Sequence, residues 1–395
     1  MTVIANTCLG IDNADLEARG GAHTAAEIAQ QPAVWSAVYS LIKDSTHINE
    51  FLTPLLAQKD LRIILTGAGT SAFIGKCMAP QMLQKLGRRV EAIATTDLVS
   101  GPELFFQHDV PTLMVSFARS GSSPESLAAV NLANWFCGKI HHLIFTCNEQ
   151  GELFQNGKSK KNVCTVLLPQ ETHDRGFAMT SSFTSMLYSA SLVFGLVGTK
   201  EADSQMVSSA AAKVIADGLP LIRSMVAQQF ERVVYLGSNE LCGLAQEAAL
   251  KLLELTDGQV VATFDSPLGF RHGPKTIVND KTLVVLFLSN LAYTRQYDLD
   301  LLRELQRDGK AGRVVALSAG AGVDLELEDS PDYFRIDGVA QASNIELALP
   351  YIVFAQIFSF LESLAVGNTP DRPSSSGTVN RVVQGVQIYP VASEA

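Results

Sequence analysis

The run Ile63-Ile64-Leu65-Thr66-Gly67 returns later in the chain as Val233-Val234-Tyr235-Leu236-Gly237. Both runs are apolar and end in glycine, the pattern of a buried strand that leads into a tight turn. Gly67 and Gly237 are 170 residues apart. This pair of runs decides the fold, because it suggests that one strand-turn-helix unit is present twice.

The same offset recurs further along the chain. Val90 matches Val260, and Thr112–Val115 matches Thr282–Val285, each 170 residues apart. The units of solenoid repeats span only tens of residues, so this longer period predicts two homologous domains.

The two copies differ in the segments that come after their strands. Copy one has loops rich in hydroxyl groups and glycine, at 66–71 and 119–126. Copy two instead has two carboxylates, Glu247 and Glu254, and a histidine, His272. We therefore expect one site that is built from two specialised halves.

Apolar runs alternate with helical patterns through both copies, which predicts an α/β fold with two doubly wound, flavodoxin-like parallel sheets related by the duplication. Ligands are expected at the carboxyl ends of the strands. A helical pattern over 24–57 precedes the first copy, and the final segment could fold back as a lid or fray. The expected divisions are a helical lead-in at 1–57, a first domain at 58–198, a helical linker at 199–230, a second domain at 231–370 and a tail at 371–395.

Composition narrows the classes of partner. The 395 residues are 47% hydrophobic and 18% charged, as in a packed globular protein, and the net charge of -10 disfavours nucleic acid and anionic membranes. An acidic protein can still hold a phosphorylated metabolite through local amides and hydroxyls. The six cysteines lack metal-ligand spacing, so we expect reduced, buried thiols and no metal.

The N-terminal sequence begins MTVIANTCLGIDNADLEARG and has acids where a signal peptide has a basic region. We find no apolar stretch of membrane-spanning length, the longest candidates being strands such as Leu283–Leu288. The sequence therefore predicts a soluble, cytoplasmic protein.

The first loop, Thr66–Ala72, satisfies the dinucleotide pattern G-x-G-x-x-A, which suggests an NAD(P)-dependent oxidoreductase as one alternative. No acid stands cleanly at the end of the following strand, and the spacing does not fit a P-loop. A tight turn with a capping hydroxyl is the structural alternative.

The second loop, Ala118–Ser126, contains an arginine and four serines around Gly121 and leads into a helix that begins with Pro124 and Glu125. Its hydroxyls and amides gather where a helix dipole favours an anion, so we predict a phosphate site; a flexible serine-rich loop is the alternative. The candidate phosphate ligands of the two loops are Gly69, Thr70, Ser71, Arg119, Ser120, Ser122 and Ser123.

Glu247, Lys251 and Glu254 are spaced at i, i+4 and i+7, on one face of a predicted helix. A solvated ion pair is the structural alternative. Because the chain also has the phosphate loops and His272, we interpret these residues as part of an acid–base site, with Glu254 and His272 as the catalytic candidates. Glu247, Lys251 and Lys275 are possible supporting groups.

These motifs together resemble the sugar isomerase (SIS) domain family. Gly69-Thr70-Ser71 and Arg119–Ser123 resemble its two phosphate loops, and Gln246–Glu254 is similar to the catalytic helix in the isomerase domain of glucosamine-6-phosphate synthase. Gly269–Lys275 resembles that enzyme's histidine loop, and Glu27-Ile28 with Gln31-Pro32 its lead-in helix. Asp174–Ser181 resembles its substrate-contacting helix start, with Thr180 as the expected contact. The stretch 382–386 has no counterpart of its ring-opening lysine.

Within the family, the chain is most similar to galactosamine-6-phosphate deaminase/isomerases of amino-sugar catabolism. The resemblance implies a homodimer with His272 contributed across the interface, a phosphorylated amino sugar as substrate and no cofactor. Glu254 would move a proton from C2 to C1, and hydrolysis of the resulting ketimine would release ammonia. The alternatives are a tagatose 6-phosphate ketose/aldose isomerase, a glucosamine-6-phosphate deaminase and a non-catalytic sugar-phosphate sensor.

Overall fold

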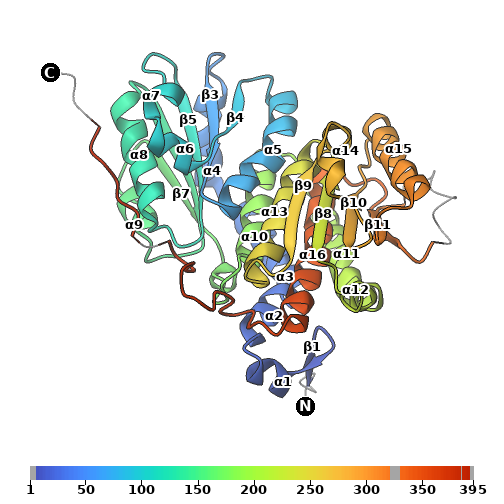
Figure 1. Ribbon diagram of the computed structural model, residues 1–395. Helices are drawn as coiled ribbons and strands as arrows, with labels where there is room; N and C mark the ends of the chain where they lie inside the picture. The colour runs from blue at the N-terminus through green and yellow to red at the C-terminus, as the bar shows by residue number, and fades with distance from the viewer. Residues whose placement is uncertain (1–5, 321–329, 384, 392–395) are drawn as a thin grey trace.

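The computed structural model describes residues 6–320, 330–383 and 385–391. Within these ranges the chain forms two five-stranded sheets, with helices between them and on their outer faces (Figure 1). A small antiparallel hairpin of β1 (Thr7–Cys8) and β2 (Ile11–Asp12) precedes them. The predicted fold class is confirmed.

The first sheet has the strand order β4-β3-β5-β6-β7, and all of its neighbouring strands are parallel. Its central strands are buried along their whole length, as expected for a sheet with helices on both faces. Its members are β3 (Arg62–Thr66), β4 (Val90–Ala92), β5 (Thr112–Ala118), β6 (Ile140–Thr146) and β7 (Val163–Leu167).

The second sheet has the same topology, with the order β9-β8-β10-β11-β12 when read in the same direction. In chain order both sheets are 2-1-3-4-5, the flavodoxin-like arrangement. The members of the second sheet are β8 (Arg232–Gly237), β9 (Val261–Asp265), β10 (Thr282–Phe287), β11 (Arg313–Ser318) and β12 (Tyr333–Arg335).

Strand pairing tests the register of the duplication. The central strands keep the offset of 170, in the pairs Ile63–Leu113 and Val233–Leu283. At the edge strand, however, Ile63 pairs with Val90 while Val233 pairs with Ala262. The predicted match of Val90 with Val260 is therefore wrong by two residues, because the turn before β9 is longer than the turn before β4.

Helices follow the strands as the repeat predicts, with short extra helices in the loops. The first domain contains α5 (Thr70–Leu86), α6 (Thr95–Ser100), α7 (Pro102–Phe105), α8 (Pro124–Phe136), α9 (Glu152–Gly157), η1 (Gln170–Thr172) and α10 (Ser181–Val193). The second contains α13 (Glu240–Leu255), α14 (Pro267–Phe270), η2 (Pro274–Ile277), α15 (Ala292–Asp308) and α16 (Asn344–Ala365). The remaining helices are α1 (Asn13–Ala18), α2 (Ala22–Ala29), α3 (Gln31–Lys43), α4 (Thr46–Leu56), α11 (Glu201–Asp217) and α12 (Leu219–Val226).

The two copies meet through α5 and α13, the first helix of each. Gly243 of α13 lies so close to α5 that an added Cβ would be 2.8 Å from the backbone nitrogen of Cys77. Lys76 Nζ donates to Gln246 Oε1 at 2.8 Å, and these two residues are themselves 170 apart in the chain. Equivalent positions therefore touch across an approximate twofold axis, which brings the two different halves of the duplication together.

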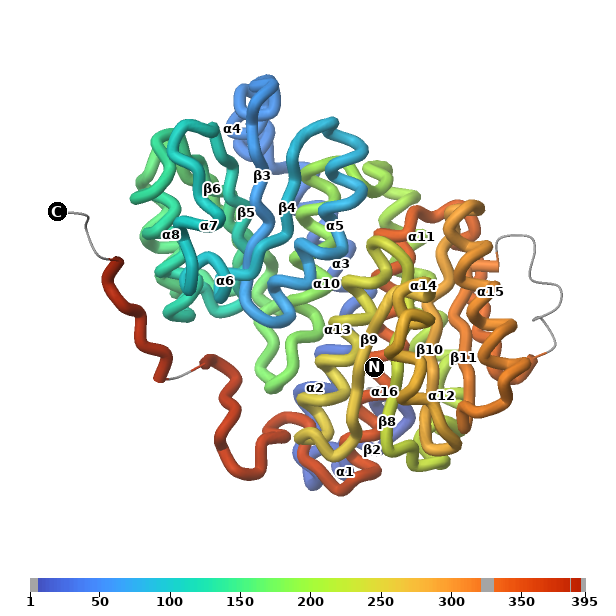
Figure 2. The backbone as a smooth tube through the Cα atoms, turned by 45° about the horizontal axis from the view of Figure 1, so that its top comes forward, coloured from blue at the N-terminus to red at the C-terminus, as the bar shows by residue number. Residues whose placement is uncertain are grey.

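Several helices outside the duplication pack into the centre of the molecule. α3 packs against α10 and α11, while α11 and α12 both pack against α16 (Figures 1 and 2). The segment expected to link the domains is thus helical, and it contributes to the core between the sheets. α2 also contacts α16, so the N-terminal segment is part of the same core.

Helix α16 corrects one expectation from the sequence. By length and composition it could cross a membrane, whereas no apolar stretch of that length was expected. Its apolar window is completely buried inside the protein, against α11, α12 and α13. Polar side chains such as Gln356 and Ser359 interrupt the apolar run and are buried with it. The packing identifies α16 as a core helix.

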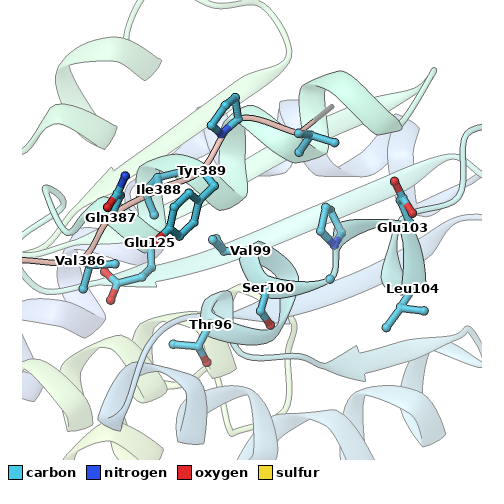
Figure 3. A pocket seen from close by; sticks show the side chains of 14 residues that line it. Thr96, Val99, Ser100, Glu103, Leu104, Glu125, Val386, Gln387, Ile388 and Tyr389 are labelled. Atoms are coloured by element: carbon cyan, nitrogen blue, oxygen red, sulfur yellow. The ribbon is translucent and has the colours of Figure 1, made fainter. Parts of the chain in front are cut away.

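The C-terminal tail leaves α16 and runs back along the first domain (Figures 1 and 2). Near its start the Asp371 carboxylate accepts hydrogen bonds from the backbone nitrogen and hydroxyl of Thr24, at 2.8 and 2.7 Å. Further on, residues 386–391 lie over α6, α7 and the start of α8 and close one side of a pocket of about 690 Å³ (Figure 3). The described part of the tail is therefore folded back onto the protein.

Candidate active site

Three charged side chains gather on one face of α13. Lys251 is fully buried, and its ammonium donates to the Glu254 carboxylate and lies 3.5 Å from Glu247 Oε1. The same ammonium donates to Thr70 Oγ1, in the first loop of copy one, at 2.9 Å. A helix of copy two thus reaches the predicted phosphate loop of copy one, and the two specialised halves lie together.

Burial separates the roles of the two carboxyl groups. Glu247 is fully buried, and its carboxyl faces the Lys251 ammonium and the Thr70 hydroxyl. Burial raises its pKa to about 8, against the opposing effect of the Lys251 charge. Glu254 keeps 24% of its side chain exposed. At neutral pH Glu247 is therefore protonated, and Glu254 is the carboxylate of this face that a ligand can reach.

Lys251 stays charged in this setting. Burial by itself would lower the pKa of its ammonium, but the negative charges beside it, that of Glu247 when ionised and that of Glu254, outweigh that effect and raise the pKa. A buried cation that contacts both the candidate base and the first loop can stabilise negative charge that develops between them.

The first loop turns sharply into α5. Gly69 has φ 54° and is exposed, while Thr70 and Ser71 are buried at the first turn of the helix. Glycine is also required at Gly67, where an added Cβ would lie 2.6 Å from the backbone of Ser71. The strand end is therefore held close to the helix N-terminus, where backbone amides favour an anion.

The second loop uses its serine side chains to fix its own shape. Ser122 Oγ accepts from the backbone nitrogen of Glu152 at 3.2 Å, and the hydroxyls of Ser123 and Ser126 are 2.7 Å apart. In contrast, the backbone N–H groups of Ser120, Gly121 and Ser123 meet no acceptor in the described part of the chain. Because they lie next to the N-terminus of α8, these amides are available to donate to an anion.

Arg119 connects this loop to two other segments. It is buried, and its guanidinium donates to the carbonyl oxygen of Phe177 at 3.2 Å and to that of Arg381 at 2.6 Å. Its charge also acts on Lys251, so the second loop and the α13 face are electrostatic neighbours.

Arg381 is a tail residue that sequence reasoning missed. Its guanidinium donates to the backbone carbonyl of Asp174, and burial, followed by the nearby charge of Arg119, lowers its pKa. The family resemblance directed attention to a lysine in 382–386, a stretch in which Gln384 lies outside the described residues. An arginine directly before that stretch was the available signal.

Thr180, the expected substrate contact, is held by Asp174 in this structure. It is fully buried, and its hydroxyl and backbone nitrogen both donate to the Asp174 carboxylate, at 3.2 and 2.9 Å. The same carboxylate accepts from the backbone nitrogens of Ser181 and Ser182, at 3.1 and 3.0 Å. Asp174 thus caps α10, and the Thr180 hydroxyl helps to shape the loop.

Glu27 supports the same loop from α2. Its carboxyl accepts from the backbone nitrogens of Arg175 and Gly176, the latter at 3.2 Å. Burial first, and the Asp174 charge second, raise the pKa of Glu27 to about 8. The lead-in helix therefore fixes the segment that carries the Asp174 cap and the Arg381 contact.

His272 and Lys275 lie away from the α13 face in this chain. His272 is exposed in the turn between α14 and η2, and no described contact joins it to Glu254. The ammonium of Lys275 is held by Glu304 and Asp308 of α15, at 2.5 Å for Asp308. Lys275 is thus occupied in a surface ion-pair cluster.

Comparison with known proteins agrees with this arrangement. A family model described as the SIS domain matches residues 55–195. D-galactosamine-6-phosphate deaminase AgaS of Escherichia coli O157:H7 is 46% identical over 381 residues, which span 94% of this chain and 96% of that protein. The solved tagatose-6-phosphate ketose/aldose isomerase from Escherichia coli is similar at 42% identity, with a TM-score of 0.85 over 94% of this chain and 98% of that one.

A more distant neighbour shares the fold alone. The C-terminal domain of glucosamine-fructose-6-phosphate aminotransferase from Francisella tularensis has a TM-score of 0.72 at 15% identity, covering 88% of this chain and 96% of that chain. The chain belongs to the SIS-domain family, in the group that contains the AgaS relatives.

Proposed function

We propose that this protein is a deaminase/isomerase that converts galactosamine 6-phosphate and water into tagatose 6-phosphate and ammonia. The observation that carries the proposal is the contact of the Lys251–Glu254 pair with Thr70. It supports the proposal because one ammonium links Glu254, the proposed base, to the predicted phosphate loop. The near full-length similarity to proteins named galactosamine-6-phosphate deaminase supports the choice of substrate.

The substrate phosphate is proposed to bind between the two loops of copy one. The open amides of Ser120, Gly121 and Ser123 and the N-terminus of α5 supply hydrogen-bond donors. The guanidinium groups of Arg119 and Arg381 lie close enough for their like charges to repel, so an anion between or beside them is favoured. Together these groups hold one end of the sugar and direct the other toward α13.

The chemistry then requires a proton to move between neighbouring carbons. Glu254 takes the C2 proton of the open-chain aldehyde, and the Lys251 ammonium stabilises the negative charge that develops on O1. Glu254 then returns that proton to C1, while O1 takes up one proton and the C2 amine gives one up. The product is a ketimine at C2. Water adds to that carbon and the C–N bond breaks, which releases ammonia and leaves the ketose phosphate.

Ring opening is assigned to His272 of a second subunit in a cytoplasmic homodimer. Within one chain His272 is exposed and has no described contact with Glu254, which supports a role across an interface. Exposed apolar side chains lie in the same part of the second domain, namely Val261 and Leu268, 52% and 45% exposed. A partner subunit would cover them.

Two alternative activities use the same groups. A ketose/aldose isomerase acting on tagatose 6-phosphate is supported by the name of the Escherichia coli structure, and a deaminase acting on glucosamine 6-phosphate would need the same proton transfer. A sensor would need no proton-transferring carboxylate beside the phosphate loop, and the exposed Glu254 argues against it.

The test is ammonia release from galactosamine 6-phosphate and from glucosamine 6-phosphate by wild type and Glu254→Gln, with tagatose 6-phosphate assayed in parallel. Wild type should release ammonia from the galacto sugar, and Glu254→Gln should lose about 10²–10⁴-fold in kcat. Glu50→Gln on α4, which removes an exposed carboxylate, is the matched control. Absence of ammonia from both amino sugars would exclude deamination, and full activity of Glu254→Gln would exclude this carboxylate as the base.

A further inference from the structure

The second copy retains the loop geometry of a phosphate site. Asn239 matches Gly69 and has φ 53° and ψ -116°, against φ 54° and ψ -127° for the glycine. This backbone region is strained for a residue with a side chain. Gly237 also lies in close contact with the helix that comes after it, since an added Cβ would lie 2.4 Å from the backbone of Leu241. We define the second-copy cradle as the loops 237–240 and 289–291.

The amides of the second-copy cradle are already used. The backbone nitrogen of Ser289 donates to the Asp298 carboxylate at 3.0 Å, and that of Asn290 donates to Asn344 Oδ1 at 3.1 Å. The backbone nitrogen of Leu291 donates to the Ser289 hydroxyl at 3.1 Å. Asn290 and Leu291 match Ser120 and Gly121 of copy one, whose amides meet no acceptor in the described chain.

Asp298 inserts a carboxylate between the two loops of this cradle. Its side chain is fully buried, and its two carboxylate oxygens accept from opposite loops, one from the hydroxyl of Ser238 and the other from the backbone of Ser289. Counting by 170 residues, the corresponding position on α8 is Ala128, and counting from the first residue of each helix it is Val130. Neither residue brings a carboxylate to the equivalent place in copy one.

A second difference between the copies also disfavours an external anion in copy two. Glu240 stands where copy one has Thr70, and its carboxylate accepts from Asn344 Nδ2 at 3.1 Å. Asn344 therefore connects Glu240 to the amide of Asn290. A carboxylate in place of a hydroxyl would repel any external phosphate from this cradle.

We propose that Asp298 is a built-in substitute for a phosphate group and that, with Glu240, it confines anion binding to copy one, so that each chain takes up a single sugar phosphate. The count of one per chain rests on the proposed function of copy one. The internal duplication thus keeps two cradles of similar shape, one open and one filled by the protein itself.

The test uses the double variant Glu240→Thr/Asp298→Ala, which gives copy two the residues of copy one. Equilibrium dialysis with radiolabelled inorganic phosphate should find one phosphate per chain for wild type and two for the variant. Asp300→Ala, an exposed acid on the same helix, is the matched control and should bind one. A folded double variant that binds the same number as wild type would overturn the proposal.

If the double variant is too unstable for dialysis, the test is the thermal melting midpoint of each protein with and without phosphate. Phosphate should then raise its midpoint by about 3 °C more than it raises that of wild type, because the ligand replaces the lost carboxylate. Equal shifts would refute the proposal. The experiment distinguishes failure of this proposal from failure of the proposed function. If wild type binds no phosphate, copy one is not the substrate site. A phosphate site gained by the double variant would still support the role of Asp298.

Discussion

Glu247→Gln tests the electrostatic description of the site most directly. The carboxyl is fully buried, and its pKa is raised from 4.5 to about 8. The folded protein therefore keeps a proton on Glu247 that the unfolded chain releases above pH 4.5. Because the folded state binds more protons across this interval, the stability contributed by Glu247 falls as pH rises.

The magnitude depends on the width of that interval. Each pH unit between the two pKa values lowers the free energy of unfolding by about 1.4 kcal/mol, which amounts to about 3 kcal/mol by pH 7 and about 5 kcal/mol by pH 8. Glutamine resembles the protonated carboxyl and does not titrate. The stability of Glu247→Gln relative to wild type should therefore increase by about 2 kcal/mol between pH 6 and pH 7.5.

The measurement is urea unfolding of both proteins at several pH values and one fixed protein concentration, since an oligomer's stability depends on concentration. Glu50→Gln again serves as the control and should show no such slope. Activity is measured on the same samples. Because Glu247 is already neutral at pH 7, the variant should lose less than about tenfold in kcat.

Two results would refute this reasoning. Parallel pH profiles for wild type and Glu247→Gln would mean that Glu247 does not hold a proton in the folded state. A loss of kcat at pH 7 as large as that expected for Glu254→Gln would mean that Glu247 takes part in the proton transfer as a carboxylate.

Two further predictions address the tail and the subunit arrangement. Arg381→Ala should raise KM about tenfold or more with a smaller effect on kcat, because it removes a charged group from the proposed phosphate end of the site. Arg381→Lys should restore part of the lost affinity. An unchanged KM would exclude Arg381 from substrate binding. Glu254→Gln and His272→Ala should each be inactive alone. Random mixing of their subunits should restore about a quarter of wild-type activity, because half of the dimers are then mixed and each mixed dimer has one intact site out of two. Mixtures that stay inactive despite demonstrated subunit exchange would place both residues in the same chain's site.

Much of the architecture could be predicted from local pattern. The repeated strand-turn-helix unit indicated the fold class, because an apolar run that ends in glycine before a helix has few other stable arrangements. The register failed where the length of a turn changed, since the two extra residues before β9 displaced the match of Val90 with Val260. The apolar length of α16 was overlooked because polar side chains interrupt the run, and only packing shows why a buried core accepts them.

The sequence by itself determined which candidate residues for chemistry recur in recognisable patterns. The hydroxyl-rich loops, the Glu247–Lys251–Glu254 face and the offset of 170 are all readable without coordinates, because helical and strand periodicity place side chains on predictable faces. The tertiary structure decided how those residues divide their work. Burial, which depends on distant parts of the chain, protonates Glu247 and leaves Glu254 accessible. Long-range packing also brings Lys251 to Thr70 and lays Arg381 beside Arg119. No local pattern could have specified these contacts, since each joins segments whose proximity exists only after the two copies have folded against each other and the tail has returned.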